Sequence, residues 1–204
     1  DESTQFLSDA LVNNQMLGLA SNGTGVAAEF DPKNGFRVKF GFQQSNTEAT
    51  NLSNSMYTLS ELGYTFTPFA LPEGTYRAWF RTDNTSPTIR TGAGLSFDQK
   101  LTSVVGLFAR FGTQEVDAGR DHFFSAGVGF QNGYTFSPQD TWGIGYAQMD
   151  LESGDKEKLA EGYYNFHLTE RLRLSFHLTH VLDSPEADET FGYLLPGVRF
   201  QAAF

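Results

Sequence analysis

Few residues in this sequence have the types and spacing that catalysis requires. Ser175 and His177 are two positions apart, so on a β-strand both side chains would face the same side. A serine nucleophile needs a histidine base and a further orienting group in one hydrogen-bonded chain. A serine and a histidine at this spacing are common by chance. We therefore predict that the protein is not an enzyme.

The four histidines do not predict a metal site either. His167, His177 and His180 fall on neighbouring predicted strands, but His167 and His177 should lie at different heights. No cluster of carboxylates joins them to complete a coordination shell. The glycine-rich run 127–133 lies within a strand and does not begin a helix, so it does not predict a phosphate-binding loop. Cysteine is absent. We expect no metal and no cofactor.

Composition and charge exclude further classes. The net charge of -10 argues against a nucleic-acid partner, which would need a basic surface. No stretch approaches the run of about 18 apolar residues expected of a membrane-spanning helix. A transmembrane β-strand exposes only every second residue to lipid, so a negative mean hydropathy does not exclude a membrane. The sequence opens on Asp1, so either a targeting segment was removed or the chain starts inside a longer protein.

The elements that position any functional side chains are predicted to be β-strands. From about residue 24 onward, apolar and polar residues alternate with a period of two, as in Phe-Arg-Val-Lys-Phe-Gly-Phe at 36–42. About 11 strands are predicted, at roughly 24–30, 36–45, 57–67, 75–83, 88–99, 103–112, 122–134, 141–150, 159–168, 171–181 and 193–204. Each strand should have one apolar and one polar face.

The predicted connections alternate between short and long. Turn residues such as proline, glycine, asparagine and aspartate mark short turns at 31–35, 71–74 and 137–140. Longer polar loops are predicted near 45–56, 83–88, 112–121, 150–158 and 182–192. Short turns on one side and long loops on the other are typical of outer-membrane barrels. The strand ending at Phe204 would then finish on the short-turn, periplasmic side.

Residues 1–23 follow a different pattern. The helical spacing of Phe6, Leu7, Ala10 and Leu11 predicts a short helix. In a barrel this segment would lie on the extracellular, long-loop side, where it could fold into the pore mouth. We expect residues 1–204 to form a single β-barrel domain whose strands occupy 24–204 and which is incomplete at its N-terminal side.

Two architectures fit strands with one apolar face: a soluble sandwich or small barrel, and a transmembrane barrel. The apolar parity carries no charged residue in the middle of any predicted strand, as lipid contact requires. At the C-terminal end of the sequence, Val198, Phe200, Ala202 and Phe204 occupy alternate positions. This pattern resembles the assembly signal of outer-membrane proteins. Aromatic residues are frequent near strand ends, where headgroups would favour them: Tyr57, Phe66, Phe69, Tyr76, Phe97, Phe111, Phe130, Trp142, Tyr164 and Phe204. We therefore favour a transmembrane antiparallel up-and-down β-barrel.

If the apolar parity faces lipid, the opposite parity lines a pore. It carries ten of the 14 Lys and Arg residues, while most carboxylates fall in loops and turns. The predicted pore-lining residues are Arg37, Lys39, Glu61, Arg77, Trp79, Arg81, Arg90, Asp98, Arg110, Glu161, Arg173 and Arg199. Guanidinium groups can hydrogen-bond sugar hydroxyls and raise the local concentration of anions. The alternative is that they only solvate the wall and pair with carboxylates across strands, an interpretation that we favour for Lys100 and Arg171 at turns.

The chain resembles the OprB-type carbohydrate-selective porins over nearly its whole length. The matching segments are 5–14, 25–30, 74–79, 94–101, 106–112, 143–148, 161–166 and 197–200, and the run 95–112 is the most specific of them. Members of that family are barrels of about 16 strands in a chain roughly twice this long. The resemblance therefore covers their C-terminal portion, and it implies Arg77, Arg110 and Glu161 as candidates for lining the pathway.

We accordingly predict an outer-membrane porin for passive diffusion of small hydrophilic solutes, with sugars or small anions as permeants. The alternative is a plugged or structural barrel that anchors the envelope. Expected partners are outer-membrane lipid and lipopolysaccharide, together with the missing barrel strands from the same longer chain or from a second chain. A homotrimer is one assembly that we expect could form. Closure is expected because unpaired backbone groups in lipid cost several kcal/mol each. The further strands would come from a longer chain, which we favour, from a second chain, or from residues 1–23 in a shorter barrel.

Overall fold

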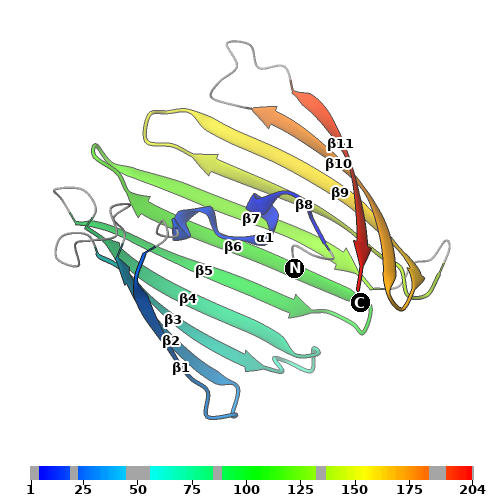
Figure 1. The fold of residues 1–204 in the computed structure, drawn as a ribbon, viewed down its shortest axis with the longest axis horizontal. Coiled ribbons are helices and arrows are strands. Elements are labelled where there is room, and N and C mark those ends of the chain that lie inside the picture. The colour runs from blue at the N-terminus through cyan, green and yellow to red at the C-terminus, as the bar shows by residue number, and fades with distance from the viewer. Residues whose placement is uncertain are drawn as a thin grey trace.

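The computed structural model describes residues 5–18, 23–44, 56–84, 89–131, 137–183 and 192–203. All strands in these ranges belong to one antiparallel sheet and follow one another in sequence order (Figure 1). The strands are β1 Gly25–Phe30, β2 Phe36–Gln44, β3 Met56–Phe66, β4 Gly74–Asp83, β5 Arg90–Lys100, β6 Val105–Glu115, β7 Arg120–Phe130, β8 Thr141–Asp150, β9 Lys156–Thr169, β10 Leu172–Asp183 and β11 Tyr193–Ala202. The prediction of about 11 antiparallel, up-and-down strands is confirmed.

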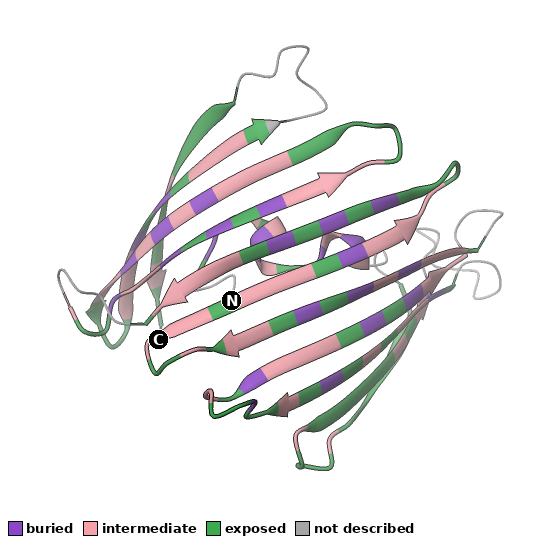
Figure 2. Ribbon diagram, turned by 180° about the vertical axis from the view of Figure 1, so that it is seen from behind, coloured by how far each residue is buried: buried purple, intermediate pink, exposed green. Residues whose placement is uncertain are grey.

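The sheet is curved, and its two faces differ in burial. Buried and exposed residues alternate along the central strands, as Figure 2 shows from the convex side. On β4, Trp79 and Arg81 are buried, whereas Phe80 between them is 50% exposed. Leu95 on β5 and Ile144 on β8 are 42% and 55% exposed. The apolar parity is therefore the outward one, the reverse of a soluble sandwich, which would bury it against a second layer.

Aromatic rings form a continuous row on the convex face near the short-turn ends of β2 to β5. Phe36, Tyr64, Phe66, Tyr76 and Phe97 follow one another with ring centroids 5.7, 5.1, 5.0 and 5.8 Å apart. Cross-strand aromatic pairs at these separations stabilise a sheet. A band of this kind at one level of the strands is the arrangement that headgroup contact favours.

Short turns join the strands at one side of the sheet. Between β1 and β2, the Asp31 carboxylate accepts hydrogen bonds from the backbone N–H and the ammonium group of Lys33, at 2.8 and 2.9 Å. These hydrogen bonds lower the pKa of Asp31. Before β8, the buried Asp140 carboxylate accepts from the Tyr164 hydroxyl at 2.9 Å and the His167 N–H at 2.8 Å. Side chains thus satisfy backbone donors that the ladder leaves free.

Several sequence predictions need correction or fall outside the described residues. Tyr57 points to the concave face, where it is buried and donates to the Leu17 carbonyl at 2.6 Å, so its place in the convex aromatic band was wrong. Its position near a strand end gave no information about which face it occupies. Phe204 and most of the loops 45–56, 83–88 and 182–192 lie outside the described residues.

The N-terminal segment 5–18 crosses the concave face instead of extending the sheet (Figure 1). It contains one α-helical turn, α1 Asp9–Val12, and one 3-10 turn, η1 Gln15–Leu17. The helix α1 lies over β7 and β8, and η1 lies over β5 to β7. The helix predicted from residue spacing is therefore very short, because hydrogen bonds to the sheet replace most of its own.

Candidate pore lining and the segment that covers it

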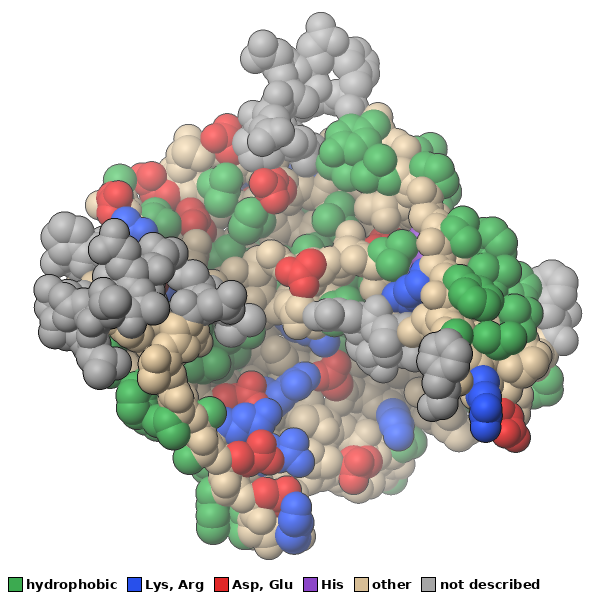
Figure 3. All heavy atoms as spheres, in the orientation of Figure 1, with side chains coloured by type: hydrophobic (Ala, Val, Ile, Leu, Met, Phe, Trp, Pro, Cys, Tyr) green, Lys and Arg blue, Asp and Glu red, His purple; other side chains and the backbone are tan. Residues whose placement is uncertain are grey.

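All predicted pore-lining residues lie on the concave parity of the sheet. The strand register places Arg37, Gly63, Arg77, Ser96 and Arg110 side by side across β2 to β6. Small residues on β3 and β5 thus separate three arginines and leave room for their side chains. In the space-filling view, charged side chains gather in the hollow of this face, and hydrophobic ones gather around its outer edge (Figure 3).

Most of these arginines and lysines pair with carboxylates. Arg37 contacts Glu29 at 3.2 Å, and Lys39 contacts Glu61 at 3.5 Å on the next strand. Arg90 reaches Asp117, at 2.6 Å, beyond the end of β6. The geometry at these positions matches the alternative interpretation from the sequence, in which the basic residues pair with acids along the wall.

Arg77 and Arg110 form a different arrangement around Asp98. Arg77 donates a hydrogen bond to one carboxylate oxygen of Asp98, and Arg110 lies 3.4 Å from the other. The Arg110 guanidinium also lies 4.8 Å from the centre of the Phe108 ring. Two guanidinium groups therefore share one carboxylate, and their shared site keeps an excess of positive charge.

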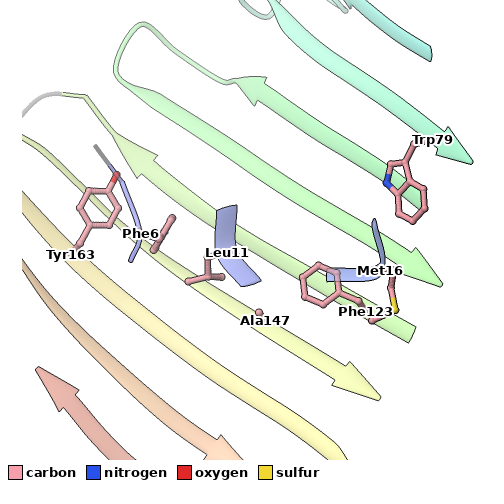
Figure 4. Packing of buried hydrophobic residues seen from close by; sticks show 7 residues of the cluster. All are labelled: Phe6, Leu11, Met16, Trp79, Phe123, Ala147 and Tyr163. Atoms are coloured by element: carbon pink, nitrogen blue, oxygen red, sulfur yellow. The ribbon is translucent and has the colours of Figure 1, made fainter. Parts of the chain in front are cut away.

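The N-terminal segment covers an aromatic part of the concave wall. Its apolar side chains pack against inward-facing residues of β4, β7, β8 and β9 (Figure 4). The buried cluster consists of Phe6, Leu11, Met16, Trp79, Phe123, Ala147 and Tyr163. Burying side chains of this size stabilises the docked segment by about 1.5–3 kcal/mol each. Trp79, predicted to line the pore, lies beneath the segment in this structure.

Polar side chains of the wall bind the backbone of the segment. Arg81 donates to the Met16 carbonyl at 2.8 Å and to Gln114 at 2.6 Å. Arg199 donates to the Gln5 carbonyl at 2.7 Å. Asn14 of the segment in turn donates to the Phe111 carbonyl at 2.8 Å. Hydrogen bonds therefore join the wall and the segment near both ends of the crossing.

Among these wall residues, Glu161 binds the segment through two backbone hydrogen bonds. Its carboxylate, 1% exposed, accepts hydrogen bonds from the backbone N–H groups of Leu7 and Ser8 at 2.7 and 2.8 Å. It also contacts His177 Nδ1 at 2.8 Å, and His177 Nε2 lies 2.8 Å from the Ser175 hydroxyl. A carboxylate can only accept, so the Nδ1 atom of His177 donates to it. Glu161, His177 and Ser175 thus form one buried hydrogen-bonded chain.

This chain has the connectivity of a serine–histidine–acid triad, which the sequence alone did not reveal. Two features set it apart from a hydrolase site. The Ser175 side chain is buried at 1% exposure, and the Glu161 carboxylate is occupied by the segment. In this structure Glu161 binds the segment, and His177 bridges Glu161 and Ser175. The missing signal was the register of β9 and β10, which puts Glu161 diagonally beside His177.

Glycines let the segment lie directly on the sheet. A Cβ atom at Gly112 would lie 2.3 Å from the Asn14 side-chain oxygen and 2.8 Å from the Met16 Cβ. A Cβ atom at Gly145 would lie 2.9 Å from a Leu11 methyl group. Glycine is therefore required at both positions for this close approach. Inward-facing glycines on successive strands were the available sequence signal for such a covered surface.

A cavity of about 700 Å³ opens on the concave face between the N-terminal segment and the short turns. Charged, amide and aromatic side chains all contribute to its wall. The lining includes Gln5, Phe6, Leu11, Glu73, Thr75, Asp98, Gln99, Lys100, Phe108, Arg110, Gln131, Gln139, Thr141, Tyr163, His167 and Arg173. Of the predicted pore-lining residues, Asp98, Arg110 and Arg173 meet here. A wall of mixed hydrogen-bonding and aromatic groups suits small hydrophilic solutes.

In the part of the chain that the structure describes, no group of three or more histidine, aspartate or glutamate side chains is placed to hold a metal ion. Within the same residues, none of the helices has the length and apolar character needed to cross a membrane.

Comparison with known proteins shows the fold. No protein-family model matches the chain, and no curated protein sequence matches it. Its structure is similar to that of Pseudomonas putida OprB determined at high pH, with a TM-score of 0.75 and 17% sequence identity. The match covers 88% of this chain and 58% of that one, so this chain spans little more than half of the matched structure's length. The chain therefore has an OprB-like fold, in an open sheet.

Proposed function

We propose that the chain forms part of an outer-membrane porin through which small hydrophilic solutes, carbohydrates above all, diffuse passively. The observation that carries this proposal is the division of the sheet into two faces. Large apolar side chains are exposed on the convex face, as lipid contact requires, while arginines and carboxylates gather in the concave hollow. The OprB-like fold supports the same assignment.

Further strands close the wall in this proposal. Among the described strands, β1 and β11 each pair on one side only. Their free backbone groups would cost several kcal/mol each in lipid. Strands from a longer chain that includes this sequence, or from a second chain, would pair with them. The N-terminal segment would then lie inside the barrel and narrow the passage between the long loops and the cavity.

The packed segment also favours a second candidate, a plugged barrel that serves as an anchor in the envelope. Its apolar side chains pack on the concave wall, and its backbone hydrogen-bonds to side chains of the wall from β4 to β11. If the remaining strands bring the opposite wall against the segment, no continuous path remains for a solute. Channel measurements separate the two candidates directly.

The deciding experiment is single-channel recording of the purified native protein in a planar bilayer, with its intact mass measured on the same sample. Stable, ohmic steps that sugars partly block are expected of the porin. Folded, membrane-inserted protein that gives no steps would overturn the channel assignment in favour of the plugged barrel. The intact mass tests whether a longer chain supplies the remaining strands.

A charge in the middle of the convex face tests the membrane assignment. Leu95→Arg places a guanidinium group at the centre of β5, and we expect it to lower the free energy of unfolding in lipid vesicles by about 2–4 kcal/mol. The matched change Leu168→Arg lies on the same face at the short-turn end of β9 and should cost about 0–1 kcal/mol. Urea titrations of vesicle-bound protein would measure both. Equal effects at the two depths would contradict a bilayer around this face.

A further inference from the structure

The cavity beside the N-terminal segment has a local charge opposite to that of the whole sequence. Lys100, Arg110 and Arg173 line it together with only two carboxylates, Glu73 and Asp98. The sequence as a whole carries a net charge of -10. A concave site with a net positive charge in an acidic protein attracts anions locally, because its low-dielectric walls focus the field.

The Asp98 carboxylate of this cavity has two positively charged neighbours. Asp98 contacts both Arg77 and Arg110, so one negative charge lies between two positive ones. The Arg110 side chain is only 11% exposed, and its Nη1 atom is buried without a hydrogen-bond partner in the described part of the chain. A buried guanidinium donor without an acceptor is unfavourable. The two guanidinium groups around Asp98 therefore add positive charge to the cavity.

Two further cations of the cavity are unpaired. The Lys100 and Arg173 side chains form no ion pair or hydrogen bond with any residue that the structure describes, whereas Arg37, Lys39 and Arg90 each have a carboxylate partner. Of the three basic residues that line the cavity, only Arg110 therefore has a carboxylate partner among the described residues. Lys100 at the end of β5 and Arg173 at the start of β10 therefore leave positive charge in the cavity for an anionic solute.

An apolar wall completes the cavity. Phe6 packs edge-on against Phe108 and Tyr163, with ring centroids 5.6 and 4.9 Å apart. Phe6 and Tyr163 are buried, and the half-buried Phe108 ring offers an apolar surface to the cavity, while Gln131 and Gln139 supply amide donors and acceptors. The volume of about 700 Å³ is within the range of small-molecule sites. The combination fits a ring with an apolar face, several hydroxyl groups and one negative charge.

We propose that this cavity is a subsite for an anionic monosaccharide, that is, a sugar bearing a carboxylate or a phosphate group. The positive charges of Lys100, Arg110 and Arg173 in the lining attract the acidic group, and the sugar ring packs on Phe108. The inference rests on the proposed porin function and narrows its substrate class: neutral sugars pass, but anionic sugars occupy the subsite at lower concentration.

The test is block of the single-channel current of the native protein by glucose, glucuronate and glucose 6-phosphate. We expect the anionic sugars to half-block the current at about tenfold lower concentration than glucose, and the difference to shrink at 1 M salt because screening weakens the attraction. Stronger block by glucuronate than by glucose 6-phosphate would identify the carboxylate as the preferred group, and the reverse order would identify the phosphate. Acetate should block no better than chloride, since it lacks the sugar ring.

Variants locate the effect in the cavity. The double variant Lys100→Gln, Arg173→Gln should abolish the preference for anionic sugars, whereas Lys33→Gln and Arg120→Gln, at exposed positions outside the cavity, should retain it. Equal block by all three sugars in an ohmic channel would overturn the subsite and leave the porin function intact. A preference that survives in the double variant would also overturn it. Absence of any channel would instead overturn the proposed function.

Discussion

Glu161→Gln is expected to release the N-terminal segment from the concave wall. The carboxylate accepts from Leu7 N–H, Ser8 N–H and His177 Nδ1, and hydrogen bonds to a charged group are worth about 1.5–3 kcal/mol each. A neutral amide weakens all three and turns an NH₂ group toward one of the donors. We expect docking of the segment to weaken by about 3 kcal/mol, which is more than a hundredfold in its equilibrium constant.

Thiol labelling measures this release. The sequence contains no cysteine, so Met16→Cys introduces a unique probe at a position that is 1% exposed. In the Glu161→Gln background we expect labelling of this cysteine by a maleimide to become about tenfold faster or more. In the porin, the same variant should give larger single-channel steps, because the segment no longer narrows the passage.

Glu61→Gln is the matched control for this variant. Glu61 also faces the concave side, but among the described residues it pairs with Lys39 across the strands and not with the segment. Its replacement should leave labelling of the Met16→Cys probe unchanged. If both glutamine variants release the segment equally, a general loss of negative charge is responsible, and the anchoring role of Glu161 is wrong.

Ser175→Ala separates anchoring from catalysis. Among the described residues, the Ser175 hydroxyl hydrogen-bonds to His177 Nε2 and not to the segment. Its loss should therefore change the labelling rate far less than Glu161→Gln does. A fluorophosphonate probe should not modify the protein with its segment docked. Covalent labelling that maps to Ser175 would instead identify an accessible nucleophile and contradict the prediction that the protein is not an enzyme.

Gly112→Val is expected to displace the segment by a steric route. The new side chain would overlap the Asn14 side chain and Met16, whose atoms lie 2.3 and 2.8 Å from the Cβ position. Overpacking of this kind typically costs about 1–3 kcal/mol, and here it also breaks the Asn14 bond to the Phe111 carbonyl. Channel conductance should increase, and the Met16→Cys probe should react faster.

Gly41→Val is the corresponding control, on the concave face of β2. There a Cβ atom would lie 3.8 Å from its nearest neighbours, at ordinary contact distance. The substitution should leave the segment docked and conductance unchanged. A Gly112→Val protein with unchanged labelling and conductance would show that the segment does not lie on β6 in the membrane.

The sequence predicted the sheet well because strand alternation is a local property. In 36–42 and 172–178 the period of two assigns each side chain to a face, whatever the rest of the chain does. The same rule put Arg77, Arg110 and Glu161 on one face before their neighbours were known. Tyr57 was misassigned because its face was inferred from its place near a strand end instead of from its parity.

What each inward side chain contacts was decided only by the tertiary structure. Leu7 and Glu161 are 154 positions apart, and the groups that meet at the wall are largely backbone atoms: the N–H groups of Leu7 and Ser8 and the carbonyls of Met16 and Leu17. Every residue has such groups, so no residue type marks them in a sequence. The alternating pattern therefore determined the two faces of the sheet, whereas the docking of the segment and the chain from Ser175 to Glu161 depend on strand register and curvature, which bring distant backbone into hydrogen-bonding range.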